Sequence, residues 1–203
     1  MVASPSLAKE LSHRGFGNLR SWGRGVDTEL FRPRPKADLG PGVRPLHLYV
    51  GRVAVEKNLP AFLDLDLPGS KWVVGDGPDL EALRGRYPRV AFWGARRGEE
   101  LARLYAQADC FVFPSRTDTF GIVMLEALAS GVPVAAYPVT GPLDVVDQGV
   151  TGWLEEDLGR ACRKARELDP LACRKAALDR SWDRSADQFL ANLRPRRRDR
   201  RAA

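Results

Sequence analysis

Two carboxylates, Asp118 and Glu126, lie eight positions apart in a segment that reads as a strand end, a polar loop and a helix (FPSRTDTFGIVMLE, residues 113–126). A helix N-terminus presents free backbone N–H groups and a partial positive charge, which suits a diphosphate. Carboxylates on either side of such an anion accept hydrogen bonds from hydroxyl groups. These residue types at this spacing therefore predict a site for a sugar nucleotide.

Helix capping is the alternative explanation for Asp118, because Thr117, Asp118 and Thr119 are all favourable N-cap residues. Capping does not explain Glu126, which follows about two turns later among apolar residues. A carboxylate in apolar surroundings needs a partner, and ribose hydroxyls would provide one. We therefore expect both carboxylates to contact the ligand.

Three further motifs each follow a predicted strand. Gly51 permits a tight turn, after which Arg52 and Lys57 can converge on one anion as a planar fork and a compact charge. Gly75 opens the turn GDGP, and Gly94 opens the loop GARR. Solvated surface cations and ordinary tight turns are the alternatives for these motifs. Neither GxGxxG nor a P-loop lysine motif is present, so a plain dinucleotide or NTPase site lacks its fingerprint.

Short apolar strands alternate with helical patterns from about residue 45 onward, which predicts βαβ units and a doubly wound parallel sheet of the α/β class. Ligands bind at the carboxyl ends of strands in such sheets, where all four motifs fall. The predicted strands span residues 46–50, 71–74, 90–93, 110–113, 133–137 and 152–154. The predicted helices span residues 58–65, 78–86, 98–107, 121–130, 142–147, 156–168 and 170–180, with a further one near 182–193.

The formal net charge of +6 belongs mostly to the tail RPRRRDRRAA, residues 194–203, which carries six Arg and one Asp and leaves +1 for the rest. A disordered, solvated tail is the main interpretation, and weak contact with an anionic membrane surface is the alternative. Nucleic-acid binding is not expected, since no aromatic residues are interleaved with the arginines.

Targeting and redox signals are sparse in this sequence. No apolar run approaches the roughly 20 residues that span a bilayer, and the first residues lack the pattern of a signal peptide. Cys110, Cys162 and Cys173 are odd in number and widely spaced, which indicates reduced thiols. These signals predict a cytoplasmic protein, with peripheral contact at the inner membrane as the alternative.

The motifs together resemble the family-4 glycosyltransferases of the GT-B fold. The resemblance rests on GRVAVEKN, GDGP, the Gly94 loop, FVFPSRTDTFGIVMLEALASGVPVAA and DQGVTGWL, in that order, and covers roughly residues 1–193. The segments WGRGVDTELF and TDTFG are similar to the bacterial α-mannosyltransferase and sulfoquinovosyl-type branch. The resemblance implies an enzyme that transfers a hexosyl group, such as mannosyl, from a GDP- or UDP-linked sugar with retention of configuration.

The resemblance also implies a role for each motif residue. Arg52 and Lys57 match the pair that neutralises the donor diphosphate and leaving group, and Asp118 matches a carboxylate that contacts the donor sugar; these three are the predicted catalytic residues. Glu126 matches the carboxylate that holds the ribose. The remaining predicted substrate-binding residues are Gly51, Gly75, Gly94, Phe120, Gly121, Ile122 and Val123. The family is metal-independent, so we expect no metal ligands and no cofactor, the sugar nucleotide being a substrate.

Two positions depart from the family pattern. Asp118 stands where glutamate is usual, which shortens its reach by one methylene. The sequence TGPLD, residues 140–144, replaces the common Gly-Gly-x-x-Glu loop, and Asp144 is the candidate substitute for that Glu. His13 and His47 are isolated, and we expect neither to be catalytic.

A complete GT-B enzyme has two Rossmann-like domains, and the resemblance implies that this chain corresponds to the C-terminal, donor-binding one. We expect residues 1–35 to be the last elements of an N-terminal acceptor domain and the linker, 36–180 the donor domain, 181–193 a crossover helix and 194–203 the tail. The chain alone is then weakly active, and its acceptor, a glycan or lipid, is unknown. Alternatives are a non-catalytic or split-enzyme subunit that docks on a separate acceptor-domain protein, and a sugar-nucleotide 2-epimerase-like protein.

Overall fold

The computed structural model describes residues 1–36, 42–118 and 120–193, and its central feature is a six-stranded parallel sheet. The strand order is β3-β2-β1-β4-β5-β6. This order confirms the predicted doubly wound α/β fold and places the topological switch point between β1 and β4. The strands are β1 Leu46–Val50, β2 Ser70–Val74, β3 Ala91–Gly94, β4 Cys110–Phe113, β5 Val134–Ala136 and β6 Gly152–Leu154.

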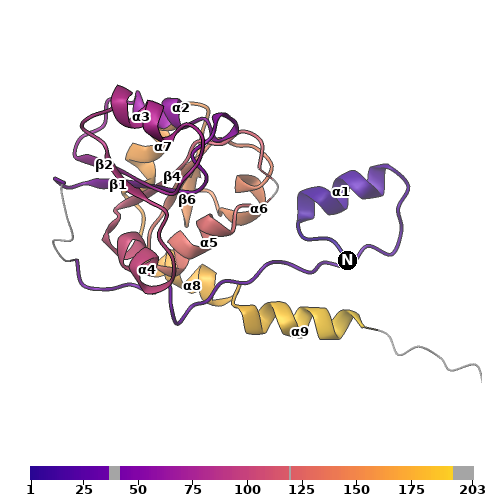
Figure 1. Cartoon of the computed structure of the whole chain (residues 1–203). Helices are drawn as coiled ribbons and strands as arrows, with labels where there is room; N and C mark the ends of the chain where they lie inside the picture. The colour runs from indigo at the N-terminus through magenta and orange to yellow at the C-terminus, as the bar shows by residue number, and fades with distance from the viewer. Residues whose placement is uncertain (37–41, 119, 194–203) are drawn as a thin grey trace, which may run out of the picture.

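Helices cover both faces of the sheet, which explains why its strands are continuous apolar runs. Figure 1 shows α2, α3 and α7 on one side and α4, α5 and α8 on the other. Successive residues of β1 alternate between these layers: Leu48 packs with the α4, α5 and α8 side, and Tyr49 with the α2, α3 and α7 side. The helices are α2 Leu59–Leu63, α3 Leu80–Arg86, α4 Gly98–Gln107, α5 Ile122–Ala129, α6 Pro142–Val145, α7 Leu158–Ala165 and α8 Pro170–Leu178.

Residues 1–24 and the last helix, α9 (Trp182–Asn192), form a separate layer beside the sheet (Figure 1). Helix α1 (Pro5–His13) begins after Ser4, whose hydroxyl oxygen accepts a hydrogen bond from the Leu7 N–H. The chain then returns so that Val2 and Ser21 form an isolated parallel bridge. The segments before and after α1 therefore meet in one bridge.

Helix α9 is tied to the returning segment by polar and aromatic contacts. The Gly23 N–H donates to Gln188 Oε1 (2.8 Å), and the Ser185 hydroxyl donates to the Gly23 carbonyl (2.8 Å). The Trp22 and Phe189 rings lie 4.9 Å apart between centroids. The predicted crossover helix thus does contact the first part of the chain.

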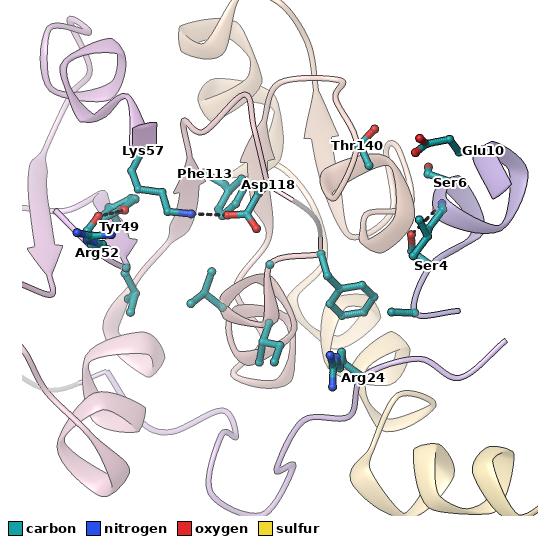
Figure 2. Close-up of a pocket in the computed structure, with 18 residues that line it drawn as sticks. Ser4, Ser6, Glu10, Arg24, Tyr49, Arg52, Lys57, Phe113, Asp118 and Thr140 are labelled. Carbon is teal, nitrogen blue, oxygen red and sulfur yellow. Dashed lines mark hydrogen bonds and ion pairs between the residues drawn. The ribbon is translucent and has the colours of Figure 1, made fainter. Parts of the chain in front are cut away.

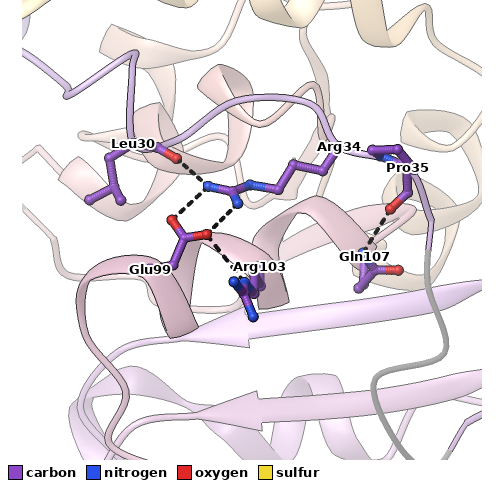
Figure 3. A network of polar contacts seen from close by, with 6 residues as sticks. All are labelled: Leu30, Arg34, Pro35, Glu99, Arg103 and Gln107. Atoms are coloured by element: carbon purple, nitrogen blue, oxygen red, sulfur yellow. Dashed lines mark hydrogen bonds and ion pairs between the residues drawn. The ribbon is translucent and has the colours of Figure 1, made fainter.

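Residues 26–36 pack on the sheet domain instead of lying free as a linker. Val26 and Phe31 are buried members of its core, and Phe31 contacts the Tyr105 ring edge-on at 5.5 Å. Figure 3 shows Arg34 donating to the Leu30 carbonyl (3.0 Å) and to both oxygens of Glu99 on α4 (2.5 and 2.9 Å). The hydrogen bond from Arg34 is the main reason that the pKa of Glu99 falls to about 2. The domain boundary at residue 35 stays a prediction. The first residue that packs into the core of the sheet domain is Val26.

The three cysteines are free and buried. No helix within the described residues is long and apolar enough to cross a membrane. The predicted basic tail, residues 194–203, lies outside the described part of the chain.

Candidate functional site

A large cavity lies at the carboxyl ends of β1 and β4, at the topological switch point. Its volume is about 860 Å³, within the range of ligand pockets. One wall comes from the sheet domain and the other from residues 1–24 (Figure 2). We call it the donor cavity; its lining residues include Ser4, Ser6, Glu10, Arg24, Gly51, Arg52, Lys57, Phe113, Asp118, Phe120, Gly121, Ile122, Val123 and Thr140.

An ion pair joins two of the predicted catalytic residues across this cavity. Lys57 Nζ lies 2.6 Å from Asp118 Oδ2, and both side chains are mostly buried (23% and 19% exposed) (Figure 2). Two more hydrogen bonds hold their loops together: Asn58 Nδ2 donates to the Pro114 carbonyl (3.1 Å), and the Ser115 hydroxyl donates to the Glu56 carbonyl (3.4 Å). The predicted contacts were of Lys57 with the diphosphate and of Asp118 with the donor sugar. The ion pair between the two residues was not predicted.

Arg52 lines the same cavity and forms an ion pair with a different carboxylate, that of Glu56. Its guanidinium lies 3.6 Å from Glu56 Oε1, and its side chain is 65% exposed. The Tyr49 hydroxyl donates to the Arg52 carbonyl (2.7 Å), which fixes the backbone after β1. Arg52 and Lys57 therefore share a cavity, while their convergence on one anion stays a prediction.

The N-terminus of α5 forms the floor beside this ion pair. Gly121 is the N-cap, with φ of +74°, a left-handed conformation that glycine adopts without a steric penalty. Ile122 and Val123 open the helix, so their N–H groups have no partners within it. Together with Phe120 they line the cavity, where the helix dipole favours an anion. All four predicted backbone positions, 120–123, thus meet Asp118 and Lys57 at one site.

Glu126 lies one turn further along α5 and does not line the donor cavity. Its Oε2 accepts a hydrogen bond from the Tyr105 hydroxyl at 2.8 Å. Burial raises the pKa of Glu126, and the hydrogen bond from Tyr105 opposes that rise. The expectation that this buried carboxylate has a partner is met by Tyr105 on α4, and its contact with ribose stays a prediction.

The three predicted glycines end neighbouring strands. The Gly51 N–H donates to the Val74 carbonyl (3.0 Å), and the Gly75 N–H donates to the Gly94 carbonyl (2.9 Å). A Cβ on Gly75 would lie 1.8 Å from the Gly51 carbonyl oxygen, so the two turns approach too closely for any side chain. Gly51 and Gly75 also line a smaller cavity of about 200 Å³, beside the donor cavity, with Asp76, Ala95 and Arg96 among its other residues.

The wall formed by residues 1–24 was not predicted from the sequence. Asp144, the candidate substitute for the family Glu, accepts hydrogen bonds from the backbone N–H (2.9 Å) and the hydroxyl (2.8 Å) of Ser6. This contact links α6 to α1 and does not bring Asp144 into the donor cavity. The only signals for this wall were the polar residues of the first segment, which have no periodicity that points to a site.

Metal-ligating clusters of three or more His, Cys, Asp or Glu are not found in the described ranges. One Asp-x-Asp pair, Asp64 and Asp66, follows α2; Asp64 accepts a hydrogen bond from the Tyr87 hydroxyl (2.6 Å), and neither residue lines the donor cavity. His47 is buried in β1 and His13 is exposed at the end of α1. A metal-independent reaction stays a prediction.

Comparison with known proteins identifies relatives along most of the chain. Residues 44–168 match the family model described as "Glycosyl transferases group 1". A "GDP-mannose-dependent alpha-mannosyltransferase" of Mycobacterium tuberculosis (strain CDC 1551 / Oshkosh) is 34% identical over 208 residues, covering 95% of this chain and 55% of that protein. "Sulfoquinovosyl transferase SQD2" of Arabidopsis thaliana is 38% identical over 173 residues, covering 76% of this chain and 34% of that protein.

Among solved structures, sucrose-phosphate synthase from Thermosynechococcus elongatus is similar with a TM-score of 0.82 and 28% sequence identity, over 94% of this chain and 56% of that one. The chain thus spans about half the length, or less, of these relatives. Its sheet order, its helical layers and the matched motifs agree with the C-terminal, Rossmann-like half of a GT-B enzyme. The chain therefore belongs to the group 1 glycosyl transferases, the family-4 enzymes of the GT-B fold.

Proposed function

We propose that this chain is the donor-binding part of a retaining, metal-independent hexosyltransferase that uses a nucleoside diphosphate sugar. The observation that carries the proposal is the Lys57–Asp118 pair beside the N-terminus of α5, at the switch point of the sheet. The Mycobacterium tuberculosis relative is named as a GDP-mannose-dependent enzyme, which makes GDP-mannose the first donor to test and UDP-linked sugars the second.

The residues that line the cavity favour separate positions for the diphosphate and for the donor sugar. The diphosphate would lie against the N–H groups of Ile122 and Val123, near Lys57 and Arg52. When the bond between the anomeric carbon and the diphosphate breaks, the electron pair stays on the diphosphate oxygen. Cationic side chains fixed beside that oxygen stabilise the developing charge, which is usually a large part of catalysis.

Asp118 would accept a hydrogen bond from a hydroxyl of the donor sugar. Its carboxylate is held by Lys57, so binding of a diphosphate to Lys57 and of a sugar to Asp118 would exchange one ion pair for two ligand contacts. The base would occupy the smaller cavity lined by Gly51 and Gly75. Glu126 would reach the ribose between these two positions after leaving Tyr105.

A subunit that docks on a separate acceptor-domain protein is the second candidate. Exposed apolar side chains on residues 1–24, on α9 and at its C-cap favour contact with a further domain or subunit. They include Leu7 (39% exposed), Phe16 (59%), Trp22 (38%), Leu190 (62%) and Leu193 (50%). The acceptor, glycan or lipid, would be bound with the help of that partner.

Calorimetric titration with GDP and with UDP tests the proposed function. We expect the folded wild-type chain to bind at least one of them, and Lys57→Ala to weaken that binding about tenfold, since a charge-assisted contact is lost. The matched control is Lys175→Ala, which replaces an exposed lysine on α8 and should leave the nucleotide affinity unchanged. If neither nucleotide binds at millimolar concentration while circular dichroism shows an intact fold, the proposal fails.

A further inference from the structure

A second cavity of about 360 Å³ lies between residues 1–24 and the start of α9. We call it the arginine cavity; its lining includes Arg24, Phe120, Asp144, Asp179, Arg180 and Arg184. Ala3, Ser4, Arg24 and Phe120 line both this cavity and the donor cavity. The two spaces are therefore neighbours with a common boundary.

Arg24 lies on that boundary with its backbone fixed on both sides. Gly23 makes two hydrogen bonds to α9, and the Val26 N–H donates to the Arg180 carbonyl (3.0 Å). A Cβ on Gly25 would lie 2.5 Å from Trp182 Cα, so the segment lies directly against α9. Figure 2 shows the Arg24 side chain at the edge of the donor cavity that faces away from Lys57.

The arginine cavity holds more positive than negative charge, and its charges are not paired with one another. Among the residues that the structure describes, the guanidinium groups of Arg24 and Arg184 have no hydrogen-bond or ion-pair partner. Arg180 donates to the Val145 carbonyl (2.8 Å), and Asp144 is bonded to Ser6. The cavity is thus lined by three arginines and two carboxylates, and Arg24 and Arg184 are exposed to solvent. An oxyanion bound between the two guanidinium groups would offset their mutual repulsion.

We propose that Arg24 and Arg184 bind an oxyanion, a phosphate or carboxylate group, that belongs to the acceptor. This inference rests on the proposed function, because it assigns the donor diphosphate to Lys57 and the start of α5. Arginine forks match the paired oxygens of phosphate and carboxylate. A space of 360 Å³ fits an acidic sugar or a phosphorylated polyol and leaves the nucleotide to the larger cavity. An acceptor anchored there has its remaining hydroxyls next to Arg24 and Phe120, at the edge of the donor cavity.

The test is a calorimetric titration of the full chain with inorganic phosphate, first alone and then with the donor cavity saturated by GDP or UDP. We expect phosphate to bind beside the nucleotide, and Arg24→Ala and Arg184→Ala each to weaken phosphate binding about tenfold. Arg184→Ala should change nucleotide affinity less than about twofold, because Arg184 does not line the donor cavity. Arg163→Ala, an exposed arginine on α7, is the matched control.

The outcomes separate this inference from the proposed function. Phosphate that displaces the nucleotide instead of binding beside it shows that the arginines serve the donor, and overturns the inference. Phosphate binding that is unchanged in the Arg24→Ala, Arg184→Ala double variant also overturns it. If the nucleotides do not bind but phosphate binds and needs both arginines, the anion site stands and the proposed function fails.

Discussion

Lys57 and Asp118 are separated by 61 residues in the sequence and form an ion pair of 2.6 Å at the switch point of the sheet. One residue follows β1 and the other follows β4, so the pairing of those two strands brings them together. A cation suited to a diphosphate and a carboxylate suited to a sugar thus neutralise each other in the same cavity. Ligand binding in this cavity must compete with their mutual attraction.

Asp118→Asn should therefore strengthen the binding of GDP or UDP, because Lys57 no longer has to leave an ion pair. An ion pair with this partial exposure contributes about 0.5–1 kcal/mol, which corresponds to a gain of about two- to fivefold. The same variant should lose sugar transfer, since the amide replaces the carboxylate that we propose contacts the sugar. Calorimetry with the nucleotide measures the first effect, with Glu81→Gln on α3 as a control for carboxylate loss elsewhere. Weaker nucleotide binding by Asp118→Asn would contradict this account of the pair.

Glu126→Gln should stabilise the fold at neutral pH and weaken the binding of nucleotide. Burial raises the pKa of Glu126, so the ionised side chain is unfavourable in the fold at neutral pH. The wild type gains stability as the pH falls through that raised pKa, and the variant lacks this gain. At pH 7 the variant should unfold at a higher denaturant concentration, yet bind nucleotide about tenfold more weakly because the proposed charged contact with ribose is lost.

Glu100→Gln, an exposed carboxylate on α4, is the control for the loss of Glu126. It should change neither the unfolding midpoint nor the nucleotide affinity. Unaltered nucleotide affinity in Glu126→Gln would remove Glu126 from the ribose site and leave only its contact with Tyr105.

Gly75→Ala should disrupt the turns at the ends of β1 and β2. The new Cβ would lie 1.8 Å from the Gly51 carbonyl oxygen, at a φ of +142°. Backbone strain and overpacking together should cost about 3 kcal/mol in the free energy of unfolding. Gly149→Ala is the matched control: its φ is +74°, and its Cβ would meet only Trp153 at 3.8 Å, so it should cost about 1 kcal/mol. Equal losses in the two variants would show that the close approach of Gly51 and Gly75 is unimportant.

The positions of the strands follow closely from the sequence. The predicted ranges 46–50, 110–113 and 152–154 are also the observed ones, because each is a short apolar run that helices cover on both sides. The largest differences are at helix ends: the pattern at 156–168 becomes α7, Leu158–Ala165. There Asp157 caps the helix by accepting a hydrogen bond from the Arg160 N–H, a local contact that periodicity does not reveal.

The site was predictable only where a motif follows its strand directly. Residues 120–123 could be placed at a helix N-terminus from the sequence, because the apolar helix begins just after Gly121. Two other contacts could not be predicted from the sequence. Glu126 pairs with Tyr105 because of how α4 lies against α5. Ser6 contacts Asp144 because of how α1 lies against α6. The cavity wall made by residues 1–24 was unpredictable for the same reason, because polar contacts between distant segments leave no spacing pattern in the sequence.

His47 should make the fold sensitive to acid. It is fully buried in β1, and burial is the main cause that lowers its pKa from 6.5 to about 4. The unfolded chain takes up a proton below pH 6.5 and the folded chain only near pH 4, so stability is lost as the pH falls through this window. The full loss for this group is about 3 kcal/mol.

Denaturant unfolding of the wild type and His47→Val at several pH values between 7 and 4 checks this prediction. Carboxylates also titrate in this range, so the quantity to compare is the difference between the two proteins at each pH. His13→Gln, at the exposed end of α1, is the control and should follow the wild type. Parallel pH curves for the wild type and His47→Val would contradict the role of His47.

The proposed function rests on the claim that a sugar nucleotide binds at the carboxyl ends of β1 and β4. Nuclear magnetic resonance of the ¹⁵N-labelled chain during titration with GDP-mannose, and then with a UDP-linked sugar, tests it most directly. With one of these donors, the largest shifts of backbone amide signals should occur at Gly51, Gly121, Ile122 and Val123, and Lys57→Ala should need about tenfold more donor to reach half of these shifts. A folded chain whose amide signals at these four positions stay unchanged with both donors would contradict the claim.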